Sequence, residues 1–250
     1  MKKILVILVS LVFYGFGNAQ IVNIENQRLS GNKNGFSGNI EFGLNIIKNT
    51  NMFYYFSNRD RALYKKDEHT IMFIGDISLV KAAGADLVNS GFEHIRYSYN
   101  MKKYHRIYLE TFQQMQYNRV QMINMRALIG TGARAEIIKY DSAAVNTGAF
   151  IMGEYEEQTD HKVNATFRYS CFLSFDFQFN KSTGINSITY YQPDFLDPAD
   201  YRVSSETSFR VSINQKLSLR LVYNLTYDSR PVPTIPSTIY GLSNTISYKF

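Results

Sequence analysis

The chain has 250 residues and a formal net charge of +6, with 19 tyrosines, 18 phenylalanines, 5 prolines and no tryptophan. This mild positive charge gives no reason to expect a nucleic-acid partner. The mean hydropathy of −0.24 argues against a helical membrane protein. It does not argue against a membrane barrel, because half of each barrel strand faces a polar lumen. Abundant aromatic residues and scarce proline favour strands over helices.

The N-terminus has the pattern of a secretory signal. Lys2 and Lys3 precede an apolar run over residues 4–16, and the small residues Gly17 and Ala19 follow it. Cleavage is expected after Ala19. The alternative is a retained membrane anchor, but the run is shorter than the roughly 20 residues that a spanning helix needs. The predicted organisation is a cleaved signal peptide, a polar periplasmic lead-in and a barrel, over residues 1–19, 20–35 and 36–250.

From residue 36 to the last residue, apolar and polar side chains alternate with a period of two, which predicts strands. About twelve strands are expected, joined by hairpins. Residues 82–90 are expected to form a longer connection, and residues 102–103 a turn. The predicted strands cover residues 36–48, 52–64, 69–81, 91–101, 104–118, 124–138, 144–158, 163–179, 185–191, 201–214 and 217–227, with a last strand that ends at Phe250.

The clearest alternation lies in residues 163–179. Its odd positions, such as Phe167 and Leu173, are almost all apolar, and its even positions, such as Arg168 and Asp176, are almost all polar. The run is long enough to cross a membrane at a tilt, which needs about 9–11 residues. Arg168 and Asp176 are interpreted as general wall residues of a barrel.

The turns alternate between two kinds. The connections assigned to the periplasm are short, whereas those assigned to the outside include the longer segments 192–200 and 230–237. Short inner turns, longer outer loops and an even strand number are typical of bacterial outer-membrane barrels. The sequence therefore predicts an all-β protein, a transmembrane antiparallel up-and-down β-barrel in the cell outer membrane.

The same alternation is compatible with a soluble barrel whose apolar residues point inward. Soluble barrels of that kind have about eight strands, and a dozen strands enclose an interior too wide to fill with the available apolar side chains. The polar side of the strands also carries charges of both signs, which fits a wet lumen. We therefore expect the polar side chains inside and the apolar side chains, Cys171 among them, against lipid.

The last three residues are Tyr248, Lys249 and Phe250. A terminal strand that alternates apolar residues and ends on phenylalanine resembles the assembly signal of bacterial outer-membrane proteins. The resemblance implies that Tyr248 and Phe250 are recognised by the barrel-assembly machinery.

Residues 91–134 carry a family resemblance. Their motifs are His94-x-Arg96-Tyr97, Glu110-x-Phe112-x-Gln114-x-Gln116-Tyr117-Asn118 and Arg126-x-Leu128-x-Gly130-x-Gly132-x-Arg134. The pattern resembles the domain-of-unknown-function 481 family, sometimes described as salt-induced outer-membrane proteins. The family implies an outer-membrane barrel and brings no established substrate or reaction.

Seven polar residues of three successive strands share the lumen side and form the candidate site. One interpretation is a constriction or solute-binding zone that filters charge. The other is a hydrogen-bonded ladder that stiffens or plugs the barrel, because polar lumen groups need partners whether or not anything passes. The residues are His94, Arg96, Glu110, Gln114, Gln116, Arg126 and Arg134.

An outer-membrane lipase or lipid A deacylase is the alternative function. Such enzymes need a nucleophile and a histidine base, and His105 is the one histidine expected to face lipid near an interface. Four scattered histidines and one cysteine give no metal-ligand spacing, so no metal or cofactor is expected. Gly130 and Gly132 lack the helix that a phosphate-binding loop requires, and are interpreted as room for bulky lumen side chains.

The expected protein is a monomer and not an enzyme. Its partners are outer-membrane lipid, the assembly machinery during biogenesis and possible small solutes. Its expected role is either passive passage of small solutes or structural maintenance of the membrane, with a charged lumen rich in arginine and glutamate.

Overall fold

The structure is a computed structural model that describes residues 34–248 except 49, 51, 215 and 216. The predicted signal peptide, most of the lead-in and Phe250 lie outside the described residues. Tyr248 is the last residue of the last strand, and only its backbone is described.

Twelve strands form one antiparallel sheet in which each strand pairs with its neighbours in the chain. The prediction of an all-β, up-and-down barrel of about twelve strands is confirmed. The strands are β1 (Gly35–Lys48), β2 (Met52–Lys66), β3 (His69–Ala82), β4 (Ala85–Asn100), β5 (Ile107–Asn118), β6 (Ile123–Tyr140), β7 (Ala143–Gln158), β8 (Val163–Gln178), β9 (Thr183–Pro193), β10 (Tyr201–Ser212), β11 (Leu217–Asp228) and β12 (Thr238–Tyr248).

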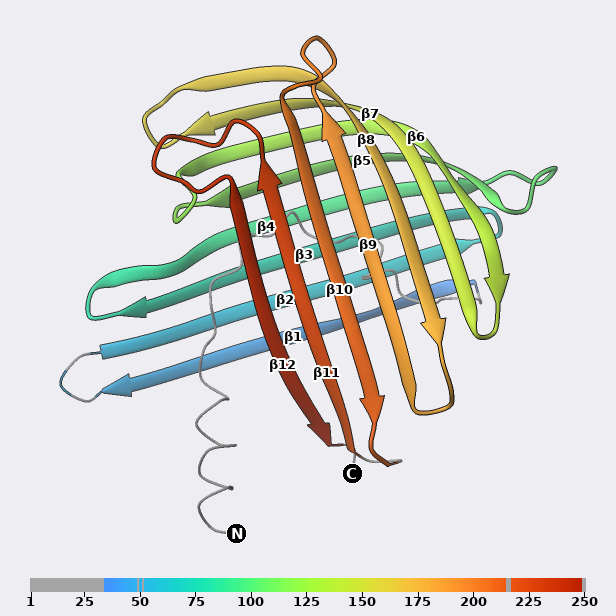
Figure 1. Ribbon diagram of the computed structural model, residues 1–250, viewed down its shortest axis with the longest axis horizontal. Coiled ribbons are helices and arrows are strands. Elements are labelled where there is room, and N and C mark those ends of the chain that lie inside the picture. The colour runs from blue at the N-terminus through green and yellow to red at the C-terminus, as the bar shows by residue number, and fades with distance from the viewer. Residues whose placement is uncertain (1–33, 49, 51, 215–216, 249–250) are drawn as a thin grey trace.

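The sheet curls so that β9 to β12 pass in front of β1 to β4 and cross them steeply (Figure 1). Such a crossing is what strand tilt gives when a twisted sheet is rolled into a barrel. Within the described residues, the ladders run from β1 to β12 and none joins β12 back to β1. The described part of the chain contains no helix long and apolar enough to cross a membrane.

One predicted connection is wrong. Residues 82–90 were expected to form a long loop, but β3 and β4 are joined by the two-residue turn Ala83–Gly84. Both residues have positive φ, 51° and 83°, as a tight hairpin of matching twist requires. The alternation is hard to see there because alanines and a glycine carry little hydrophobic contrast.

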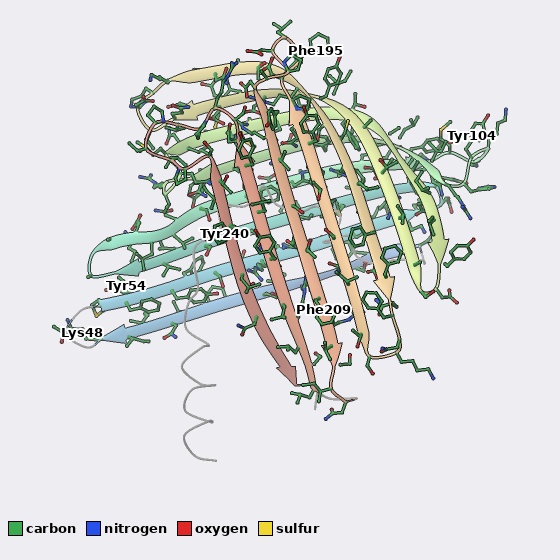
Figure 2. All side chains as sticks on the ribbon, in the orientation of Figure 1. Lys48, Tyr54, Tyr104, Phe195, Phe209 and Tyr240 are labelled. Carbon is green, nitrogen blue, oxygen red and sulfur yellow. The ribbon has the colours of Figure 1, made fainter. Side chains whose placement is uncertain are left out.

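The next connection is longer than expected. The chain leaves β4 after Asn100 and enters β5 at Ile107, so Tyr104 and His105 lie in a loop instead of a strand. Tyr104 is exposed at this end of the molecule (Figure 2).

The two sides of the strands separate as predicted. In β8, Phe167 and Leu173 are 64% and 54% exposed, whereas Arg168 and Phe172 on the other side are 1% and 3% exposed. Phe209 lies on the outer surface of the sheet as well (Figure 2). The polar side therefore faces the lumen and an apolar surface faces outward, which excludes the soluble-barrel alternative.

Candidate functional site in the lumen

A buried group of charged residues lies in the lumen near the β9–β10 and β11–β12 connections. We call it the mouth cluster. Its members come from five strands and one connection, and each strand member points inward because of the alternation along its strand. They are Arg126, Glu154, Glu156, Arg168, Asp200, Arg202 and Asp228.

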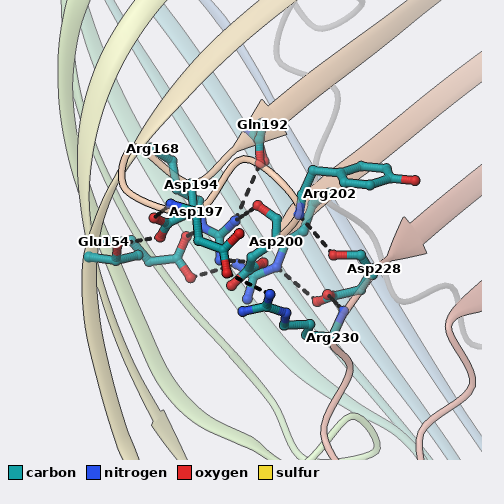
Figure 3. Close-up of polar contacts among 12 residues, drawn as sticks. Glu154, Arg168, Gln192, Asp194, Asp197, Asp200, Arg202, Asp228 and Arg230 are labelled. Atoms are coloured by element: carbon teal, nitrogen blue, oxygen red, sulfur yellow. Dashed lines mark hydrogen bonds and ion pairs between the residues drawn. The ribbon is translucent and has the colours of Figure 1, made fainter.

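Glu154 of β7 pairs with three arginines of the mouth cluster, two of which, Arg168 and Arg202, are labelled beside it in Figure 3. Its carboxylate lies 2.5 Å from Nη1 of Arg202 and 3.2 Å from Nε of Arg168. Nε of Arg126 is 3.8 Å away. These three arginines come from β10, β8 and β6, and Glu154 itself is only 4% exposed. One buried carboxylate therefore joins β7 to both of its neighbours and to β10, which is not adjacent to it in the sheet.

The remaining acids compensate the three guanidinium groups. Glu156 accepts hydrogen bonds from Arg126 and from Arg202, the latter at 3.2 Å. Asp228 accepts a bond from Nε of Arg202 at 2.9 Å. Arg168 donates to a carboxylate oxygen of Asp200 at 3.0 Å and to its carbonyl oxygen at 3.2 Å. Three cations thus face four anions, which removes most of the cost of burying them.

The connection 194–200 folds onto this cluster. Asp194 forms an isolated bridge with Arg168, and its side chain accepts hydrogen bonds from Thr166 and from the backbone of Leu196 and Asp197. Burial opposes ionisation, but these hydrogen bonds keep the pKa of Asp194 below its ordinary value. The connection is therefore an ordered part of the barrel mouth.

The β11–β12 connection reaches the same place. Arg230 lies 2.6 Å from Asp197, so an ion pair joins the two longest connections at this end of the barrel (Figure 3). Both side chains are about half exposed, and such pairs contribute little stability on their own, about 0–1 kcal/mol.

A second group of polar residues lies deeper in the lumen, toward the β4–β5 connection. We call it the inner cluster, and Glu110 is its centre. Arg96 lies 3.0 Å from one carboxylate oxygen of Glu110, and Ser98 and Arg134 donate to the other at 3.0 and 3.4 Å. Its members are His94, Arg96, Ser98, Glu110, Gln114, Gln116 and Arg134.

The inner cluster extends through His94. Nε of Arg96 donates to Nε2 of His94 at 3.2 Å, and Nδ1 of His94 lies 3.2 Å from Oε1 of Gln114. This arrangement places the ring proton on Nδ1. Gln114 in turn donates to Gln116 at 2.9 Å.

The structure thus brings six of the seven predicted site residues into one hydrogen-bonded network. The seventh, Arg126, belongs to the mouth cluster, but it is the cross-strand partner of Gln116 and so adjoins the inner cluster. Arg168, interpreted from the sequence as a general wall residue, is instead one of the most deeply buried side chains.

Sequence reasoning missed an apolar layer between the two clusters. Phe112, Phe150 and Phe172 lie on the lumen side with ring centroids 5.9 and 6.3 Å apart in succession. The guanidinium of Arg96 lies 5.3 and 5.5 Å from the rings of Phe112 and Phe150, within the range of a cation–π interaction. The aromatic layer consists of Phe112, Phe150, Met152, Phe172, Ile188 and Tyr190.

A glycine lies opposite each phenylalanine of the layer. Phe112 pairs with Gly130, Phe150 with Gly132 and Phe172 with Gly148. A Cβ at Gly130 would lie 2.6 Å from the Phe112 ring, so the interpretation of this glycine as room for a bulky lumen side chain is confirmed. These glycine–aromatic pairs are the signal in the sequence that locates the layer.

A small cavity of about 40 Å³ remains where the two clusters and the aromatic layer meet. Its lining includes His94, Gln116, Arg126 and Gln192. A cavity of this size has room for water beside these polar side chains, although carbon atoms make up most of its lining. It is too small to pass a solute.

The other part of the lumen is accessible. On the lumen side of β1, Asn39, Glu41 and Asn45 are exposed, as is almost every residue of this strand, which pairs only with β2 among the described ladders. The side chains of Arg59 of β2 and Arg220 of β11 are 64% and 49% exposed. The clusters and the aromatic layer therefore fill the lumen beside β4 to β10, whereas its polar lining beside β1, β2 and β11 meets solvent.

The histidine considered as a catalytic base and the single cysteine of the chain both lie outside the lumen. His105 is exposed in the β4–β5 connection, and Cys171 is exposed on the outer side of β8. Across the described part of the chain, no group of three His, Cys, Asp or Glu residues is placed to hold a metal ion.

The fold and the lumen define a class: a twelve-stranded up-and-down barrel with an apolar exterior and a charged, partly filled interior. Residues 31–250 match the family described as "Protein of unknown function, DUF481". The chain belongs to this family, and the resemblance seen in the sequence is confirmed.

Two solved structures are similar in fold. One, described as "KdgM porin", shares 12% sequence identity, with 80% of this chain and 95% of that chain covered and a TM-score of 0.42. The other, described as "NanC porin structure in rhombohedral crystal form", shares 7% identity, with 78% and 94% covered and a TM-score of 0.45. No curated protein matches the chain.

Proposed function

We propose that this chain is an outer-membrane barrel that passes small polar solutes through the accessible part of its lumen. The observation that carries the proposal is the division of the lumen. Side chains of Arg168, His94 and Glu110 are almost inaccessible to water, whereas Asn39 and Arg59 are exposed. The filled side is a rigid wall, and the passage runs along β1, β2 and β11.

The lining of this passage favours weak selectivity. Glu41 carries a negative charge, and Arg59 and Arg220 carry positive charges, so both signs line the same path. Rings of one sign are what channels use to select ions strongly. We therefore infer passage by size and polarity instead of by charge.

Single-channel recording in planar lipid bilayers tests the proposal. The purified barrel is expected to show small, discrete conductance steps. Asn39→Trp is expected to lower the conductance about twofold, because an indole narrows a passage lined by this residue. Ile40→Trp is the matched control, since Ile40 is 79% exposed on the outer side of the same strand. It should leave the conductance unchanged.

Silence of the unmodified barrel, and of a variant that combines Arg96→Ala with Arg126→Ala, would remove the channel and leave a purely structural barrel. The burial of both clusters is the observation that favours this second candidate. Lipid hydrolysis by the purified barrel that disappears in His105→Ala would instead establish the enzymatic alternative.

A further inference from the structure

A hollow lies on the outer surface of the barrel, over strands β5 to β8. It is a groove of about 480 Å³ with a mainly apolar lining. Its position is separate from the lumen, because the side chains that wall it belong to the apolar side of their strands. These outward-facing residues are Gln113, Met115, Ala127, Ile129, Gly153, Tyr155, Ala165 and Phe167.

Three small residues form the floor of the groove. Ala127, Gly153 and Ala165 lie on three consecutive strands, and Tyr155 pairs with both Ala127 and Ala165. Gly153 pairs with Ile129 on one side and with Phe167 on the other. Each small residue therefore lies beside large side chains of the neighbouring strands, and this difference in size makes a depression in the apolar outer surface.

The absence of a side chain at Gly153 has no packing reason within the barrel. A Cβ at Gly132 or Gly148, in β6 and β7, would approach other atoms to 2.2 and 2.4 Å, so these positions need glycine. At Gly153 the nearest atom, Cε1 of Phe167, would be 3.6 Å away, which is an ordinary contact. Its φ is not in the left-handed region either. The space above Gly153 is therefore open to the exterior and is not taken up by packing within the barrel.

We propose that the groove binds one acyl chain of a membrane lipid. This inference rests on the proposed membrane location, because the groove lies in the apolar surface that hydrocarbon then covers. The walls of the groove, Ile129 and Phe167, are 67% and 64% exposed and lie on either side of Gly153. A second copy of the chain fits less well, since a convex barrel wall would rest on these side chains and leave the floor empty, without the contacts that good packing requires.

Gln113 supplies a polar contact in the groove. It is exposed on the outer side of β5, where most other side chains are apolar, and it lines the groove beside Ile129, its cross-strand partner. A carboxamide facing hydrocarbon is costly unless it finds a hydrogen-bond partner. The ester carbonyl oxygen at the head of a phospholipid acyl chain would provide that partner.

Tryptophan fluorescence measures this binding directly, because the chain contains no tryptophan of its own. Ile129→Trp places a probe at the groove, and Ile77→Trp places a control on β3, where the side chain is 45% exposed to the same surroundings. Each variant is reconstituted into phosphatidylcholine vesicles that contain a rising fraction of phosphatidylcholine with brominated acyl chains, which quench tryptophan on contact.

At low fractions of brominated lipid, the groove probe is expected to be quenched more strongly than the control probe. The difference should correspond to an affinity for lipid about threefold higher at the groove, which is a difference in binding free energy of about 0.7 kcal/mol. Adding Ala165→Leu fills the floor and should abolish the difference. Ala149→Leu, an exposed position on the outer side of β7 that does not line the groove, should preserve it.

Each other outcome contradicts the proposal in its own way. Equal quenching of the two probes would mean ordinary lipid contact without a site. Weaker quenching at the groove would mean that protein covers it. No quenching at either probe would mean that the barrel does not enter the bilayer, and the proposed function would fail together with the groove. The first two outcomes leave the conductance test with Asn39→Trp untouched, because passage through the lumen does not depend on what occupies the groove.

Discussion

Replacing Glu154 by glutamine is expected to destabilise the barrel by about 3–5 kcal/mol, the usual cost of breaking a buried ion pair from one side. The substitution keeps the size of the side chain and removes its charge. Arg126, Arg168 and Arg202 would each lose the buried carboxylate that they share. Urea titration of the barrel in detergent micelles, followed by the mobility of the folded form in electrophoresis, measures the loss.

Glu157→Gln is the matched control for this prediction. Glu157 adjoins Glu156 in β7, but its side chain is 24% exposed and pairs with His161, which is 84% exposed. Exposed pairs contribute about 0–1 kcal/mol. A cost for Glu154→Gln as small as that of the control would show that the mouth cluster does not hold the barrel together.

Gly132→Ala is expected to lower the free energy of unfolding by about 1–3 kcal/mol or more, the usual cost of overpacking a core. Among the substitutions predicted here, only Glu154→Gln should cost more. A Cβ at Gly132 would lie 2.2 Å from the carbonyl oxygen of Ala149 and 2.6 Å from the Cα of Phe150. Both are backbone atoms, so no change of rotamer relieves the clash. Strands β6 and β7 would have to separate beside the aromatic layer, and the same urea titration detects the effect.

The same substitution at Gly153 provides the comparison. Its Cβ would make only ordinary contacts, and replacing a strand glycine by alanine removes unfolded-chain entropy, so Gly153→Ala should be neutral or stabilising by up to about 1 kcal/mol. If both variants lost the same stability, crowding at Gly132 would not be the cause.

The alternation of side chains was sufficient to predict the fold. A period of two assigns each residue to one face, and a long amphipathic strand such as β8 needs no tertiary information to be recognised. The same rule placed His94, Arg96 and Glu110 on the lumen side, where the structure joins them. Residue type and parity therefore carried most of the information about which residues can meet.

The alternation along a strand shows which face a residue lies on, but it does not predict the register between strands. Glu154 and Arg202 lie 48 positions apart, and their contact depends on how four consecutive strands are staggered. The aromatic layer was missed because its phenylalanines lie on a side that is otherwise polar, which breaks the simple rule of alternation. The fold of connection 194–200 onto Arg168 depends on backbone hydrogen bonds to Asp194, which no residue pattern encodes.

Nitroxide scanning along β8 tests the central claim most directly, namely that the charged side of each strand faces a filled lumen and the apolar side faces lipid. With Cys171→Ser as background, one cysteine at a time is introduced, labelled and tested for collisions with oxygen, which concentrates in lipid, and with a water-soluble nickel chelate. Labels at Phe167, Tyr169 and Leu173 should collide with oxygen, and labels at Arg168, Ser170 and Phe172 with neither reagent. Reversed alternation, or free access of the nickel chelate to the second set, would contradict the account.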